Sequence, residues 1–177
     1  SPPVDAVDSP WRDGQTAAWL HRGGGTVTLV EGMTFCVSAA SGDIEPGSPM
    51  GLFVLDTRVL SRLRLMVDGE LPRSLGSLPT GPVSAAFVAS CEPTVGRSER
   101  LVVVRRRRLG QGLRETAEIQ NTGLGPRTVS VQLSVEVDFA DVFEVKEGRP
   151  PSPFVTPQWK GGRSRYVHPG HAPVRLD

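Results

Sequence analysis

Apolar and polar residues alternate without interruption along residues 128–139, TVSVQLSVEVDF. Successive side chains of a β-strand point to opposite faces, so a period of two predicts a strand with one buried face. The predicted buried face carries the apolar side chains, and the polar side chains lie on the opposite face. The apolar residues are Val129, Val131, Leu133, Val135, Val137 and Phe139.

Shorter segments with the same period lie between closely spaced glycines and prolines. They are residues 26–38, 62–67 and 83–91, the first with a turn at Glu31-Gly32. The second leads into Asp68-Gly69, a pair typical of tight hairpin turns. Many short strands with frequent turns and almost no helical pattern predict an all-β fold, an antiparallel β-sandwich with little helix.

A hairpin with a defined register is predicted around Gly110-Gln111-Gly112. A three-residue loop with the second glycine in the left-handed conformation is a common hairpin type. The resulting register pairs Leu109 with Leu113, Arg107 with Glu115, Arg105 with Ala117 and Val103 with Ile119. Because a buried guanidinium is costly without a carboxylate partner, we expect Arg107 and Glu115 to form a structural ion pair.

The next turn, NTGLGPR, is predicted to bring residues 128–139 back alongside the second strand of this hairpin. Ile119 would then lie opposite Val129, and Glu115 opposite Leu133. All three strands would share one apolar face, as neighbouring strands of an antiparallel meander do.

Four consecutive arginines at residues 105–108 raise the question of nucleic-acid binding. A strand divides them, because Arg105 and Arg107 face one way while Arg106 and Arg108 face the other. No aromatic stacking pattern accompanies the run, and the net charge of +1 gives no global attraction to polyanions. No stretch of 18 apolar residues is present. We therefore expect neither nucleic acid nor a membrane as a partner.

Composition divides the chain into three parts. Residues 1–25 form a lead-in, residues 26–148 the β-sandwich, and residues 149–177 a Pro/Gly-rich, flexible tail or linker without sustained periodicity. The start shows neither a signal peptide nor an initiator Met, so we expect a processed or excised piece. Cys36 and Cys91 are expected to be free, buried thiols in a reducing compartment, which favours a cytoplasmic location.

Two polar clusters interrupt apolar segments. The triplet Asp56-Thr57-Arg58 separates two apolar runs and is either a structural turn or part of a site. Asp138 and Asp141 lie in DFADVFEV, where continued alternation would bury Asp141 and therefore predicts a bulge or a partner for it. Paired carboxylates can perform acid–base chemistry, but structural hydrogen bonding is the favoured role for both.

No metal site and no cofactor are predicted. His21, His168 and His171 lack an accompanying cluster of cysteines or acids. The chain also lacks the G-x-S-x-G, H-E-x-x-H and P-loop motifs. We therefore assign no catalytic residue to this chain.

Four segments, taken in order, resemble a known family. They are FCVSAASGDI (35–44), GLFVLDTRVLSRLRLMVDG (51–69), RRRRLGQGLRETAEIQNTG (105–123) and VSVQLSVEVDFADVFEVKEG (129–148). Together they resemble the N-terminal domain of bacterial glycogen debranching enzymes of the amylo-α-1,6-glucosidase type. The resemblance covers roughly residues 26–148, and the segment after Gly148 does not look like the further strands that the family usually has there.

The resemblance implies a β-sandwich that precedes a larger (α/α)₆ toroid carrying the glycosidase carboxylates. These residues contain no such toroid, so the resemblance implies a non-catalytic accessory domain. It would pack on the missing catalytic domain and help to frame an α-glucan cleft. The positions that match the signature blocks, and are expected to contact substrate or the other domain, are Asp56, Thr57, Arg58, Asp138 and Asp141. An isolated sandwich would expose its docking surface, which predicts a homodimer.

The alternative is a stand-alone carbohydrate-binding or protein-interaction module. Sugar-binding modules usually present exposed aromatic side chains, and only 6% of this chain is aromatic. Trp11, Trp19 and Trp159 lie outside the predicted core strands and are the residues that would test this alternative.

Overall fold

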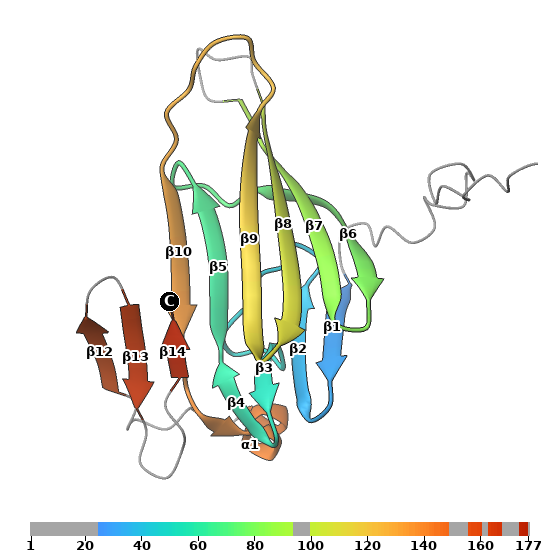
Figure 1. Cartoon of the computed structure of the whole chain (residues 1–177), viewed down its shortest axis with the longest axis vertical. Coiled ribbons are helices and arrows are strands. Elements are labelled where there is room, and N and C mark those ends of the chain that lie inside the picture. Colours follow the sequence, from blue (N-terminus) through green and yellow to red (C-terminus); the bar gives the residue numbers. More distant parts are fainter. Residues whose placement is uncertain (1–24, 94–99, 149–155, 161–162, 168–173, 177) are drawn as a thin grey trace, which may run out of the picture.

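The computed structural model describes residues 25–93 and 100–148, together with the backbone of three short strands between residues 156 and 176. The described strands pair antiparallel and form four sheets (Figure 1). The predicted all-β sandwich with little helix is confirmed. Within the described residues, no helix has the length and the apolar content needed to cross a bilayer.

One layer of the sandwich is a four-stranded meander. Its strands, in spatial order, are β6 (Arg73–Gly81), β7 (Ser84–Cys91), β8 (Leu101–Gly110) and β9 (Gly112–Asn121). The β8–β9 hairpin has the predicted register: Leu109 lies opposite Leu113 and Arg107 lies opposite Glu115. Side chains in β8 alternate between buried and more exposed positions along its whole length, which is the period-two pattern of a strand with one covered face.

The other layer combines two smaller sheets. A five-stranded sheet has the order β1 (Thr26–Glu31), β2 (Thr34–Ala39), β3 (Gly51–Val54), β4 (Thr57–Leu60) and β11 (Ala140–Asp141). A two-stranded sheet pairs β5 (Arg62–Val67) with β10 (Val131–Glu136). The single residue Ser61 separates β4 from β5, so the chain runs directly from one sheet into the other (Figure 1).

The hydrophobic core lies between the two layers. One cluster joins Leu29 of β1 and Leu60 of β4 to Phe87 and Leu109 of the four-stranded sheet. A second cluster joins residues of β5 to residues of β7 and β8. Burial of these side chains drives the two layers together, because each fully buried Leu or Phe contributes on the order of 1.5–3 kcal/mol.

The predicted partner of the 128–139 segment is wrong. Its strand β10 pairs with β5, with Val131 opposite Val67 and Leu133 opposite Leu65, rather than with β9. The chain between β9 and β10 crosses to the other layer (Figure 1). Alternation indicates which face of a strand is apolar but does not choose its neighbour, and β10 lies at a sheet edge where Val131 and Leu133 remain exposed.

Beyond β10 the predicted strand ends early. Phe139 adopts a positive φ of 53°, the two-residue strand β11 follows, and a short helix α1 spans Val142–Glu147. Three short strands follow in a separate sheet: β12 (Thr156–Lys160), β13 (Arg163–Val167) and β14 (Val174–Leu176). They lie in the segment that composition alone marks as an extended tail, because three- to five-residue strands are too short for their alternation to stand out.

Candidate functional site

The five candidate contact residues meet at one end of the sandwich. Asp56 lies in the turn between β3 and β4, and Thr57 and Arg58 begin β4. The two-residue strand β11 pairs with β4, so that Thr57 lies opposite Asp141. Asp138 lies three residues before Asp141 and contacts Arg58. The fold therefore brings together two sequence blocks that lie about eighty residues apart.

Arg58 and Asp138 form a buried ion pair. Their side chains are only 6% and 5% exposed. The Arg58 Nε donates to Asp138 Oδ2 at 3.0 Å and to Oδ1 at 3.2 Å, and its Nη2 also contacts Oδ2. The Arg58 Nη1 donates to the carbonyl oxygens of Ser48 and Met50 at 3.0 and 3.2 Å. Every guanidinium nitrogen is therefore partnered, which is the condition for burying such a charge.

Gly51 makes room for this arginine. A Cβ atom added at Gly51 would lie 2.5 Å from the Arg58 Cδ, well inside van der Waals contact. Gly51 begins β3 and is itself buried. The Arg58 side chain therefore packs directly against the Gly51 backbone, where only glycine leaves enough room.

Asp141 serves as the N-cap of α1. Its Oδ1 accepts from the backbone N–H of Phe143 at 2.8 Å, and the Glu144 carboxylate accepts from the Asp141 N–H at 2.9 Å. This reciprocal capping box satisfies amide groups that the first helical turn leaves free. Both Asp138 and Asp141 are thus held in structural hydrogen bonds, with Arg58 and with backbone respectively, and do not form an acid–base pair.

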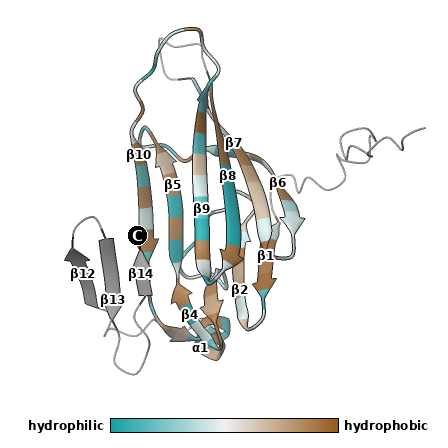
Figure 2. Ribbon diagram, viewed as in Figure 1, coloured by the Kyte–Doolittle hydropathy of each residue, from teal (hydrophilic) through white to brown (hydrophobic). Residues whose placement is uncertain are grey.

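Large apolar side chains surround this end of the sandwich. We call Met33, Val54, Leu55 and Phe143 the hairpin-end surface; they are between 40% and 67% exposed. The Leu55 N–H donates to the Met33 carbonyl at 2.9 Å, which joins the β1–β2 and β3–β4 turns. The Val142 N–H donates to the Asp56 carbonyl at 2.8 Å, which ties α1 to the same turn. In Figure 2 the brown of β3 and β4 reaches this end, beside α1.

A second buried polar cluster lies between the two layers. The Glu115 carboxylate accepts from Arg105 Nε at 2.7 Å and from Arg107 Nε at 2.6 Å. Arg105 also forms an ion pair with Asp43, and Arg107 Nη2 donates to the Gly42 carbonyl. The two guanidinium charges therefore face two carboxylates, and both arginines are almost fully buried.

The sequence pattern predicts that Arg107 lies beside Glu115. It does not predict that the 41–43 loop supplies further acceptors to Arg105 and Arg107. That loop follows β2 in the other layer and reaches β8 through Asp43 and Gly42. Gly42 has φ +86°, and an added Cβ would lie 2.9 Å from the Phe87 ring. The signal available in the sequence is SGD, a short polar turn flanked by apolar residues, but nothing local identifies its partner.

Both cysteines are free and buried, as expected. Burial raises the pKa of the Cys36 thiol, because the thiolate would lose its hydration, and the nearby Arg107 guanidinium only partly opposes this effect. Burial likewise raises the pKa of the Cys91 thiol. Cys36 is therefore a neutral core side chain and not an activated nucleophile.

No cluster of metal-ligating side chains occurs within the described part of the chain. His21, His168 and His171, together with the side chains of Trp11, Trp19 and Trp159, lie outside the residues whose side chains are described.

The fold is an antiparallel β-sandwich, and the turns and helix at one of its ends carry exposed apolar side chains. The family described as the N-terminal domain of some glycogen debranching enzymes matches residues 29–167. The chain belongs to this family. No curated protein matches the chain.

Proposed function

We propose that this chain is the accessory domain of a glycogen debranching glycoside hydrolase of the amylo-α-1,6-glucosidase type. In this proposal the hairpin-end surface packs on an (α/α)₆ catalytic domain, and the adjoining polar residues frame the edge of an α-glucan cleft. The observation that carries the proposal is the position of the five candidate residues within the range that the family matches: they build and border an exposed apolar end of the sandwich.

The exposure of that end favours a docked partner. Met33, Leu55 and Phe143 are each at least 60% exposed although they are large and apolar. They come from three different segments that backbone hydrogen bonds hold together. Contiguous apolar side chains at a rigid position commonly mark a protein contact.

The chemistry of the carboxylates supports an accessory role. Glycoside hydrolysis generally needs two carboxylates, one to donate a proton and one to act as a base or nucleophile. Here Asp138 is bound by Arg58 and Asp141 caps a helix. The glycosidase carboxylates are therefore expected in the other domain, while Asp56 and Thr57 at the rim can make polar contacts to it or to the glucan.

The free thiols of Cys36 and Cys91 suit a reducing environment. We accordingly propose a cytoplasmic location and a role in storage-glucan metabolism.

Calorimetric titration with maltooligosaccharides tests the accessory role. The chain alone should show neither glucan hydrolysis nor measurable binding, and both should appear when it is joined to the (α/α)₆ catalytic domain that the proposal requires. Millimolar or tighter binding by the chain alone, lost on Trp11→Ala or Trp19→Ala, would instead favour a stand-alone carbohydrate-binding module.

A further inference from the structure

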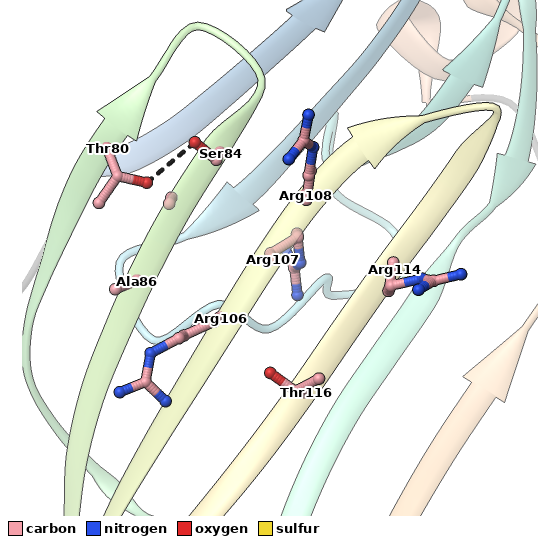
Figure 3. Close-up of a pocket in the computed structure, with 9 residues that line it drawn as sticks. Thr80, Ser84, Ala86, Arg106, Arg107, Arg108, Arg114 and Thr116 are labelled. Atoms are coloured by element: carbon pink, nitrogen blue, oxygen red, sulfur yellow. Dashed lines mark hydrogen bonds between the residues drawn. The ribbon is translucent and has the colours of Figure 1, made fainter.

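The outer face of the four-stranded sheet carries an open groove of about 300 Å³ over β7, β8 and β9 (Figure 3). It lies on the face opposite the core, because Arg106 and Arg108 are exposed while Arg105 and Arg107 point inward. Its exposed polar lining includes Arg106, Arg108, Arg114, Thr80 and Thr116, with Ser84 partly buried, and the buried Arg107 lies beneath them.

The three exposed arginines of this groove differ in their ion pairing. Arg106 forms an ion pair with Glu118 at 3.0 Å. Arg108 lies directly opposite Arg114 across the β8–β9 ladder, and neither forms an ion pair within the described part of the chain. Like charges at directly opposed positions of a sheet destabilise it. The side chains of Arg108 and Arg114 thus start from opposed positions of the sheet, and a bound anion would offset their like charges.

Hydroxyl groups complete the lining. The Thr80 Oγ1 donates to the Ser84 Oγ at 2.9 Å, and Thr116 lies on β9 near Arg114 (Figure 3). Guanidinium groups match the geometry and charge of phosphate oxygens, and hydroxyls add donors to them. The same hydroxyls can bond a polar sugar.

The lining also narrows the class of ligand. None of the lining residues is aromatic, so neither nucleobases nor the flat face of a neutral sugar finds a stacking surface. The volume is at the lower end of the roughly 300–1,000 Å³ of ligand pockets, which suits a single small ligand. We propose that the outer-face groove binds the phosphate group of a phosphorylated sugar, with Arg108 and Arg114 as the charge partners.

The phosphate part of this inference is independent of the proposed function, whereas the choice of a sugar rests on it. The groove lies on the four-stranded sheet and the hairpin-end surface lies on the turns of the other layer. The two proposals can therefore fail separately. The chain could bind phosphate without docking on a helical domain, or dock on such a domain without binding phosphate.

Titration calorimetry on the full chain with glucose 6-phosphate, glucose and inorganic phosphate tests the proposal at two salt concentrations. Glucose 6-phosphate should bind most tightly, glucose should not bind, and the affinity should weaken as salt screens the charges. Arg108→Gln and Arg114→Gln should each weaken binding by at least about tenfold, the loss of one charge-assisted contact.

Arg73→Gln is the matched control, because Arg73 is an exposed arginine on β6 of the same sheet and outside the groove. Its binding should equal that of the unchanged chain. Each groove variant removes one of two opposed like charges and should therefore remain folded, which a thermal melt without ligand checks.

Equal affinity for inorganic phosphate and glucose 6-phosphate would overturn the sugar part of the proposal. The entire proposal would be overturned if neither glucose 6-phosphate nor inorganic phosphate bound. It would also be overturned if Arg108→Gln and Arg114→Gln both left the affinity unchanged. Binding of a DNA duplex that depends on Arg108 and Arg114, without binding of glucose 6-phosphate, would also overturn it and identify a nucleic-acid surface.

Discussion

Arg58 on β4 and Asp138, 80 residues later, form a buried ion pair that fastens the β3–β4 turn to the segment leading into α1. Both residues lie within the range that the family matches. Both side chains are almost fully buried, with 6% and 5% exposed, which favours a structural role for the pair. The pair nonetheless positions the exposed residues around it.

Removing one partner of this pair should be strongly destabilising. Asp138→Ala leaves the Arg58 charge buried and uncompensated, and the expected loss is about 3–5 kcal/mol of unfolding free energy. Asp56→Ala is the control, because Asp56 is an exposed carboxylate of the adjoining turn and should change stability by less than about 0.5 kcal/mol. Urea denaturation of both variants measures the difference, and equal midpoints would contradict the structural role of Asp138.

Two glutamates of β9, Glu115 and Glu118, allow a buried ion pair to be compared with an exposed one. Glu115 holds Arg105 and Arg107 in the core, whereas Glu118 pairs with Arg106 in solvent. Glu115→Gln should cost several kcal/mol, because it removes the negative charge that both buried guanidinium groups face. Glu118→Gln should cost no more than about 1 kcal/mol, the usual value of an exposed pair. A similar loss in the two variants would show that the Glu115 contacts contribute little.

The raised pKa of Cys36 predicts a dependence of stability on pH. The unfolded thiol ionises near its ordinary pKa of about 8.5, while the folded thiol keeps its proton to a higher pH. Between these values the folded state binds more protons, so unfolding becomes easier as pH rises. Below about pH 8 this contribution is constant.

Denaturation at pH 7 and pH 10 measures this effect in the unchanged chain and in Cys36→Ala. The fall in unfolding free energy between the two pH values should be smaller in the variant, because the other titrating groups are common to both. An equal or larger fall in the variant would rule out Cys36 as the source.

The hairpin-end surface predicts self-association of the isolated chain. Leu55→Ser with Phe143→Ser should shift the chain from dimer toward monomer in sedimentation velocity, because apolar contact area is lost. Leu124→Ser is the control, since Leu124 is fully exposed but lies in the β9–β10 connection, away from this surface. A monomer at high concentration in the unchanged chain, or an equal shift with Leu124→Ser, would contradict dimerisation through this surface.

The local parts of the fold can be predicted from sequence. The β8–β9 register follows from Gly110-Gln111-Gly112 and from matching apolar positions, because a short loop leaves few alternatives. The partner of β10 cannot be predicted in the same way. Its exposed apolar face and the crossing of its preceding loop depend on contacts distant in sequence.

In the candidate site too, local features can be predicted from sequence and long-range contacts cannot. Helix α1 has a sequence signal that strand alternation obscures: Asp141 and Glu144 have capping-box spacing, and Gly148 follows at the C-cap in the left-handed conformation. The pairing of Arg58 with Asp138 and of Arg105 with Asp43 has no such signal, since each joins segments more than 60 residues apart.

Amide hydrogen exchange tests whether a catalytic domain docks on the hairpin-end surface. The chain is compared alone and with the (α/α)₆ catalytic domain that the proposed function requires, with exchange followed at Met33, Leu55 and Phe143. Docking predicts slower exchange at these three residues on binding and no change at Leu124. A reading frame without such a domain, or protection confined to other parts of the sandwich, would contradict it.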